Sequence, residues 1–506
     1  MNKKLLVASV AGVLGGMVLN TANAATVVSP SGIGQTVLVP YFTAQGGNAT
    51  LINIVNTDST NAKIVKVRFR GAEFSDDVFD FTLFLSPNDV FTGAVSQNAG
   101  GGATFSTSDK SCTLPASVSQ DFVTSRVASG AAGTLEGYVE IFIMADLVNG
   151  AAPPPAVDIW DKVLHSAGVA PCGITNADIT ALGLDPSVGW PGDGAAGPYD
   201  TAVAAAAALG IAAPTPTLMA NSFIVDGPRA AGYGVEATAL VEALGGPYHV
   251  TFSPQLATQV PAGRWDDWSS DQGLADTPAA VGGDVARAAY YDLPDLSTQA
   301  NAVVNGAPVA ANYGTTNTAI ADVSAAIASR YVANEFLTDS TVAAATDWVF
   351  SMPTRRYYMQ YVPAVAPATG FVFDGAGALP IGPYFTGVTA ANEQPLASFD
   401  VYDREEQTSA PASFVISPGV PGVLNLTGEV GVIGFNGSAT TSEVLSAKLT
   451  LQNVDTAGYA DGWMAIDITG GVPVEPVIGF AAIRASNNPA GGDSFNYGAA
   501  INHRFY

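Results

Sequence analysis

The chain has few ionisable side chains and very few metal-binding or redox ones. Only 12% of its 506 residues are charged, about half of the usual share in globular proteins. Its three histidines are far apart, and none lies in an HExxH motif or beside a second ligand at helical spacing. There is also no G-x-S-x-G elbow, no P-loop and no G-x-G-x-x-G turn after a strand. These absences argue against zinc hydrolases, α/β-hydrolases and nucleotide-binding enzymes.

Cysteine is almost missing, with only Cys112 and Cys172 in the sequence. Neither has a CxxC partner, which argues against a zinc site. In an exported protein an even, sparse pair predicts one disulfide, with two free thiols as the alternative. The bond would close a long loop, for which the chain-entropy model gives roughly 4 kcal/mol of stabilisation.

The first 24 residues have the features of an export signal. Two lysines near the start precede an apolar run over 5–19, and residues 22–24 read Ala-Asn-Ala, a small-x-small cleavage site. The apolar run is shorter than the ~20 residues that a membrane-spanning helix needs. We therefore expect cleavage after residue 24, with a retained N-terminal anchor as the alternative.

Basic residues are scarce relative to acidic ones. The sequence has 19 Lys and Arg against 44 Asp and Glu, a formal net charge of −25. Such a charge repels nucleic acid and anionic membranes and attracts divalent cations. Hydrophobic residues make up 48% of the chain, enough for a large core. We therefore expect a folded protein with no nucleic-acid partner.

Aspartates are the recurring polar feature, and two clusters are candidate calcium sites. Asp76 and Asp77 lie in SDDVFD, and Asp266, Asp267 and Asp271 lie in WDDWSSDQGLAD. Calcium takes six to eight oxygen ligands and tolerates irregular loops. Neither cluster matches an EF-hand or a glycine-rich calcium repeat. The alternative for each is a solvated acidic turn.

Alternating hydrophobic runs at both ends of the chain predict β-strands, and an Ala/Gly/Pro-rich stretch separates them. We expect a mainly β protein, with an antiparallel β-sandwich frame from the N- and C-terminal parts and a mixed helical insertion between them. The expected regions are a signal peptide (1–24), an N-terminal β-sandwich (25–150), the insertion (151–340) and a C-terminal β-rich region (341–506). Whether the ends form one sandwich or two stays open. Within the insertion, helices are expected from Thr201 and over TAIADVSAAIASRYVANEFL from Thr318.

The stretch from Val67 to Val95 predicts a hairpin with a charged face. If 71–77 is the turn and Phe69 pairs with Phe79, then Arg68 lies opposite Asp80 and the two apolar faces coincide. We expect an exposed cross-strand pair, worth under about 1 kcal/mol, whose role is to fix the register. Asp76 and Asp77 would remain at the turn as the only possible cation ligands of this stretch.

Several motifs at the two β-rich ends carry a family resemblance. They are VLVPYFTAQGGNATLINIVNTD and its continuation to FTG, TDWVFSMPTRRYYM, VYDREEQ, EVGVIGFNG and PVIGFAA. Together they resemble exported cell-surface proteins of Gram-negative bacteria, of the surface-layer type, including those that sheathe outer-membrane vesicles. The family's usual threonine in the middle of the WVxxxPT motif is Ser351 here. The resemblance implies a surface lattice or sheath and supplies no catalytic residues.

From these features we expect a non-enzymatic, self-assembling structural protein, located outside the outer membrane. Its partners would be copies of itself and the lipopolysaccharide of the outer-membrane surface, with calcium as the possible cofactor. One alternative is a secreted adhesin or glycan-binding module that uses residues 151–340 for recognition. A further alternative is a secreted hydrolase with a carboxylate pair such as Asp266 and Asp267, because such a pair has no compact signature.

Overall fold

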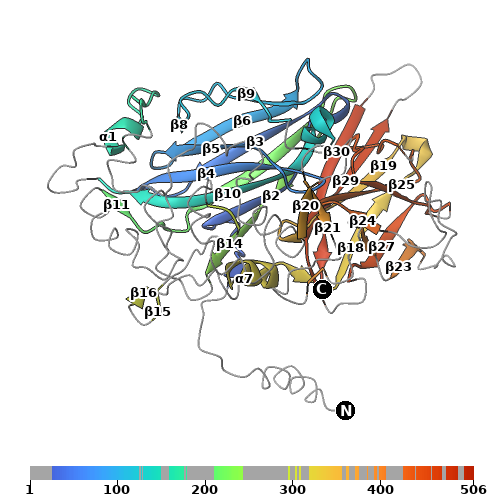
Figure 1. Cartoon of the computed structure of the whole chain (residues 1–506). Helices are drawn as coiled ribbons and strands as arrows, with labels where there is room; N and C mark the ends of the chain where they lie inside the picture. The colour runs from blue at the N-terminus through green and yellow to red at the C-terminus, as the bar shows by residue number, and fades with distance from the viewer. Residues whose placement is uncertain are drawn as a thin grey trace, which may run out of the picture.

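Short runs rich in β-branched and aromatic residues form most of the ordered elements, as their composition favours. The computed structural model is mainly β, with several antiparallel sheets and few helices, which confirms the predicted fold class (Figure 1). The residues that the structure describes are 26–149, 159–175, 178, 210–242, 294–296, 303–304, 307–308, 318–355, 360–363, 371–374, 384–385, 393–395, 398–405 and 425–506, apart from 125–126, 128, 439, 457, 470–473 and 488–494.

The N-terminal half forms a sandwich of two sheets. Sheet A has the order β1 (Thr26–Val28), β14 (Thr238–Glu242), β2 (Thr36–Thr43), β10 (Glu136–Leu147), β4 (Ala62–Gly71), β5 (Asp77–Leu85) and β8 (Cys112–Leu114), and β11 (Ile211–Ala212) also pairs with β10. Sheet B has the order β13 (Ala231–Glu236), β12 (Leu218–Asp226), β3 (Asn48–Asn56), β6 (Val90–Gln97), β7 (Ala103–Ser106) and β9 (Gln120–Asp121). The two sheets enclose a core rich in valine, isoleucine and phenylalanine.

The C-terminal half forms a second sandwich. Sheet C has the order β23 (Ser398–Asp403), β27 (Asp461–Asp467), β18 (Tyr331–Leu337) and β31 (Arg504–Phe505). Sheet D has the order β26 (Leu451–Val454), β25 (Val430–Phe435), β19 (Ala345–Ser351), β29 (Ile478–Asn487) and β30 (Phe495–Asn502). Short two-stranded pairs complete the described β structure: β15 (Val303–Val304) with β16 (Ala307–Pro308), β17 (Ala328–Ser329) with β28 (Glu475–Pro476), β20 (Gln360–Pro363) with β21 (Phe371–Asp374), and β22 (Glu393–Pro395) with β24 (Asn425–Thr427).

The segment expected to be a helical insertion contributes strands to both sandwiches. Strands β11 to β14 belong to the N-terminal sandwich, because 218–226 alternates between buried and more exposed side chains with the period of a strand. The helix predicted from Thr318 is α7 (Thr318–Ala326), and it ends before Tyr331 and Phe336, which lie in β18. The prediction of one long helix there was wrong. Residues 201–209 of the other predicted helix lie outside the described part.

Other helical elements in the described part are short. They are α1 (Ile159–Val163) and the 3-10 turns η1 (Gln45–Gly47), η2 (Gly130–Thr134) and η4 (Ser340–Val342). None of the described helices is long and apolar enough to cross a membrane.

The two sandwiches share buried cores. The strands of the first, blue to green, lie beside those of the second, yellow to red (Figure 1). One cluster joins Tyr41, Ile224 and Tyr233 of the first sandwich to Val349 and Phe480 of sheet D. A second cluster places Leu38, Phe142 and Leu240 of sheet A with the core between sheets C and D and with helix α7. Sheet A is therefore covered on both faces, by sheet B on one side and on the other by parts of the C-terminal half and, at one end, by helix α1.

Candidate functional site

The hairpin β4–β5 has the predicted register but not the predicted exposure. Phe69 pairs with Phe79, and Arg68 lies opposite Asp80. Both charged residues are buried, at 0% and 4% exposure. The expectation of an exposed pair was wrong because the second face of sheet A is covered instead of meeting solvent. A charge inside a protein is tolerated only when it is paired and hydrogen-bonded.

The charged side chains on this covered face form a layer of ion pairs between strands. Lys66 Nζ lies 2.6 Å from Asp80 Oδ1, and Arg70 Nε lies 3.3 Å from Glu140 Oε2 on β10. Arg68 donates to the Asp77 carboxylate and, at 3.4 Å, to the carbonyl of residue 294. The tyrosine beside this layer, at position 138, donates to the carbonyl of residue 353. The layer therefore links β4, β5 and β10 to segments from later in the chain.

The first predicted calcium cluster lies in this layer. Asp76 and Asp77 are both buried, and the Asp77 carboxylate binds Arg68 and lies 3.9 Å from Arg70 Nη1. A calcium ion at Asp77 would have to replace these arginine contacts. Within the described ranges, no three His, Cys, Asp or Glu side chains are grouped so that they could hold a metal. Asp266, Asp267 and Asp271 lie outside the described residues, so calcium binding stays a prediction.

A buried lysine joins four segments at one end of the first sandwich. Lys63 Nζ lies 2.7 Å from Asp58 Oδ2, 2.6 Å from Asp146 Oδ1 and 2.6 Å from Thr215 Oγ1. Burial would raise the pKa of Asp58, but hydrogen bonds from Lys63 and from backbone amides outweigh it and lower that pKa to about 2. Burial raises the pKa of Asp146 although Lys63 opposes this. Each of the three protons of the ammonium group therefore has an acceptor within the protein, and the site is structural.

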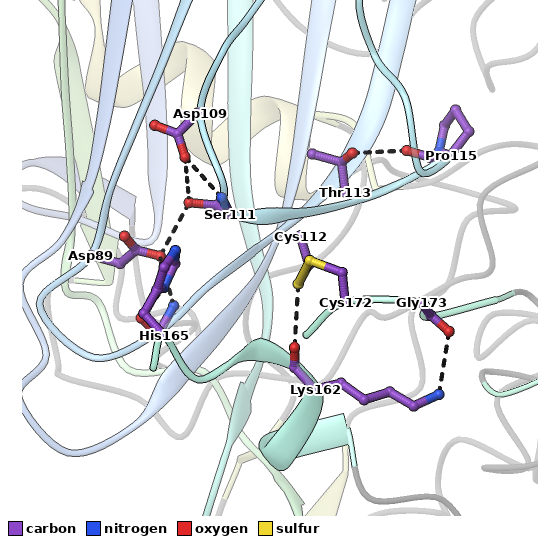
Figure 2. Close-up of a disulfide and its surroundings, with 11 residues drawn as sticks. Asp89, Asp109, Ser111, Cys112, Thr113, Pro115, Lys162, His165, Cys172 and Gly173 are labelled. Atoms are coloured by element: carbon purple, nitrogen blue, oxygen red, sulfur yellow. Dashed lines mark hydrogen bonds and ion pairs between the residues drawn. A yellow bond between two sulfur atoms is a disulfide. The ribbon is translucent and has the colours of Figure 1, made fainter. Parts of the chain in front are cut away.

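The predicted disulfide is present. Cys112 on β8 is bonded to Cys172, which follows α1, and the bond ties this helix to the edge of sheet A (Figure 2). Residue 112 also contacts the carbonyl of Lys162 in the same view. The predicted pairing of Cys112 with Cys172 is therefore confirmed.

A serine, a histidine and an aspartate meet near the disulfide, but not as a catalytic triad. The Ser86 hydroxyl lies 3.0 Å from His165 Nδ1, and Asp89 Oδ2 lies 3.5 Å from the same nitrogen. A triad places its serine and its acid on opposite ring nitrogens, so that the ring can pass a proton between them. A second serine is held by carboxylates: the Ser111 hydroxyl lies 3.2 Å from Asp89 Oδ2 and 2.8 Å from Asp109 Oδ1, as the dashed lines in Figure 2 mark. These contacts fix the loops around the disulfide.

Two buried carboxylates hold one segment of the second sandwich against the first. Glu136 accepts hydrogen bonds from Tyr41, from Gln45 and from the backbone amide of residue 448. Asp347 accepts from the amides of residues 444 and 445. Burial raises the pKa of both carboxyls, that of Asp347 to about 6, against the effect of these hydrogen bonds. The segment 442–449 thus lies between the sandwiches, and the amides of residues 444, 445, 448 and 449 are bound by carboxylates from both sides.

The outer face of sheet B is uncharged over its three central strands. Strand alternation places twelve side chains on this face, which we call the neutral face: Met219, Asn221, Phe223 and Val225 on β12, Ala49, Leu51, Asn53 and Val55 on β3, and Val90, Thr92, Ala94 and Ser96 on β6. Leu51, Phe223 and Val90 are 40%, 42% and 46% exposed. The solvated face of an antiparallel sheet is normally polar, so this face departs from the usual pattern.

The outer face of sheet C carries a different arrangement. The rings of Tyr402 and Trp463 are stacked, with centroids 4.3 Å apart and planes at 11°. Cross-strand pairing places Glu335 in the same row, on the other side of Trp463. Because β27 lies between β23 and β18, the uncovered indole face is turned toward Glu335. We call these three residues the aromatic patch.

Neither outer face was predicted from the sequence. The signal was present in Asn48–Asn56, where residues 51, 53 and 55 alternate with buried isoleucines and are themselves uncharged. A strand that is uncharged on both faces is expected to be covered on both.

Comparisons of the chain with protein-family models, with curated proteins and with solved structures found no match.

Proposed function

We propose that the protein is a non-enzymatic, self-assembling structural subunit of a Gram-negative cell surface, exported and located outside the outer membrane. The observation that carries this proposal is the use of its buried charged groups. Lys63, Glu136 and Asp347 each join separate segments, and the ion-pair layer on sheet A joins strands. Glu136 and Asp347 hold the two sandwiches together through residues 442–449, and a repeating subunit requires such a single body.

The burial of these charged groups supports the same proposal. A catalytic carboxylate or base must lie within hydrogen-bond reach of a substrate, directly or through one water. The groups named above are buried among protein partners and act on other parts of the chain. Sequence features add further support, namely the export signal, the low charge density and the resemblance of the two β-rich ends to surface-layer proteins.

The proposed partners are other copies of the chain and the lipopolysaccharide of the outer-membrane surface. Both the chain, at a formal charge of −25, and a phosphate-bearing surface are anionic, so contact between them needs a divalent cation. Calcium is the proposed bridging ion. The same charge disfavours nucleic acid as a partner.

Electron microscopy of the purified mature chain, with and without calcium, tests this proposal. We expect ordered sheets or sheaths, together with a regular surface layer on cells that express the protein. Removal of calcium with a chelator should detach the layer from cells. Monodisperse monomers in both conditions, together with a featureless cell envelope, would refute the proposal.

A second candidate function, a glycan-binding module, is favoured by the aromatic patch. An exposed indole offers an apolar face to a sugar ring, and a neighbouring carboxylate accepts hydrogen bonds from hydroxyl groups. Trp463 and Glu335 have this relation. Binding of a neutral oligosaccharide that is lost in Trp463→Ala, with no assembly of the wild-type chain, would favour this alternative. Hydrolysis of any member of a glycan panel, lost in Asp266→Asn or Asp267→Asn, would instead favour the carboxylate hydrolase.

A further inference from the structure

We propose that the neutral face of sheet B is the surface through which two copies of this chain associate, with sheet B of one copy stacked on sheet B of the other. This inference rests on the proposed self-assembly and names the surface that carries it. It starts from the twelve uncharged side chains on β12, β3 and β6.

Charge determines where two such copies can approach each other. Each copy has a formal charge of −25, so most pairs of surfaces that meet bring like charges together, which is costly. The neutral face brings none over its three central strands. Acidic groups lie at its described border: Glu236 is on β13, Asp121 is on β9, and Asp109 accepts hydrogen bonds from the amide and the hydroxyl of Thr92. Depletion of charged residues at the centre, with charged groups at the rim, is typical of protein interfaces.

The size of the face is sufficient for a specific contact. Four rows of paired residues run across the sheet, from Met219–Val55–Val90 to Val225–Ala49. With strand spacings of about 4.8 Å and a rise of about 3.4 Å per residue, the face and its flanking strands cover roughly 600 Å² per copy. A pair of copies would bury about 1,200 Å², the lower end of the range for stable specific interfaces.

The shape of the face also suits stacking. A Cβ at Gly232 would lie 2.4 Å from Cζ of Phe223, and one at Gly234 would lie 3.7 Å from its Cδ2. The Phe223 ring therefore covers the two glycines of β13 and does not stand up from the sheet. Two sheets with such faces can pack about 10 Å apart with their strands inclined by about 30°.

The polar groups of the central row can be satisfied by a second copy. Asn53 Nδ2 donates to Asn221 Oδ1 at 3.1 Å, and Thr92 lies next to Asn53 in the same row. Amides both donate and accept, so an identical row facing them supplies complementary partners. In a two-fold arrangement the same patch is used on both subunits, and residues at its centre lie near their own copies.

Charge insertion provides the first test. Leu51→Glu and Val90→Glu each place a carboxylate on an exposed position of the face, and association would bury each carboxylate against an uncharged surface without a cationic partner. We expect both to weaken dimerisation by at least about 100-fold, measured by sedimentation of the purified mature chain in chelator. The matched control is Val169→Glu, because Val169 is 54% exposed and lies on the loop after α1. This control should leave dimerisation unchanged, and circular dichroism checks the fold of all three variants.

Cross-linking provides the second test and does not depend on weakening the contact. Both native cysteines are in the disulfide, so Asn53→Cys introduces a unique thiol at the centre of the face. A short bismaleimide should convert this variant to covalent dimers. The control Glu335→Cys, on the outer face of sheet C, should stay monomeric under the same treatment.

The possible results separate this inference from the proposed function. Assembly that persists in Leu51→Glu and Val90→Glu, with no cross-linking through position 53, would overturn the neutral face and leave self-assembly standing. Association that requires calcium and is unaffected by both substitutions would also overturn the role of the neutral face. A wild-type chain that never associates would overturn both proposals.

Discussion

Replacing Lys63 by methionine tests whether the buried charged groups hold the sandwich together. The change keeps most of the aliphatic stem but removes the ammonium group that contacts Asp58, Asp146 and Thr215 at 2.6–2.7 Å. Asp58 retains some solvent contact and can recover hydration. Asp146 is buried and cannot, so it must stay charged without its cation or take up a proton.

The magnitude follows from the burial of this pair. Removing one partner of a buried ion pair costs about 3–5 kcal/mol. Burial already raises the pKa of Asp146, and losing Lys63, which lowers it, raises it further. Protonation then limits the loss, so we expect about 3 kcal/mol near neutral pH. In the variant, folding retains a proton on Asp146 that the unfolded chain releases, so its stability should fall as the pH rises.

Urea unfolding of the oxidised chain, followed by circular dichroism, measures this loss. Lys162→Met is the matched control, because Lys162 Nζ lies 3.2 Å from Asp178 and both side chains are partly exposed. It should cost less than about 1 kcal/mol. Adding Asp146→Asn to Lys63→Met should recover at least half of the loss, since no charge is then left buried. Equal losses in the two lysine variants, or no recovery in the double variant, would refute this reasoning.

Three further predictions concern stability. Burial raises the pKa of Glu475 to about 8, against hydrogen bonds from the amide of residue 385. The folded chain therefore keeps a proton on Glu475 between its ordinary pKa of 4.5 and pH 8. Across this window Glu475 should lower the stability by about 1 kcal/mol per pH unit, a contribution that Glu475→Gln removes in urea titrations. Gly428→Ala would place Cβ 2.5 Å from the carbonyl oxygen of residue 72, between the sandwiches. It should lower the stability by about 1–3 kcal/mol more than Gly458→Ala, because Gly458 has the same left-handed backbone but open space around it. Replacing Cys112 and Cys172 together by serine should cost about 2–5 kcal/mol, measured by thermal unfolding, and a cost below 1 kcal/mol would show that the loop is held by other contacts.

Local patterns were enough to predict the strands and some pairings. The alternation of Val67, Arg68 and Phe69 against Phe79 and Asp80 fixed both the register and the face of each side chain, as the structure confirms. A period of two does determine which residues share a face. The disulfide was likewise predictable, from an even, sparse pair of cysteines in a chain expected to be exported.

What covers a face was not predictable from the strand itself. Aspartates of the neighbouring strand β5 pair with the charged face of β4, but its other partners, Glu140 on β10 and the carbonyl of residue 294, are far away in sequence. Similarly, the regular spacing from Ile320 to Phe336 predicts a helix throughout, yet pairing with β27 turns 331–337 into a strand. Tertiary contacts decide between these states when local preference is weak.

The placement of charge in the first sandwich is the reverse of the usual antiparallel pattern. Sheet A carries Lys66, Arg68 and Arg70 with their acidic partners on a covered face, while the exposed face of sheet B is uncharged over its central strands. A hydrophobic-in, polar-out sheet would do the opposite. Contacts within the chain explain the buried charges of sheet A, because their ion pairs and hydrogen bonds join strands and segments from both halves. No contact within the described residues explains why the outer face of sheet B is uncharged. Burial of this face against a second copy would explain it.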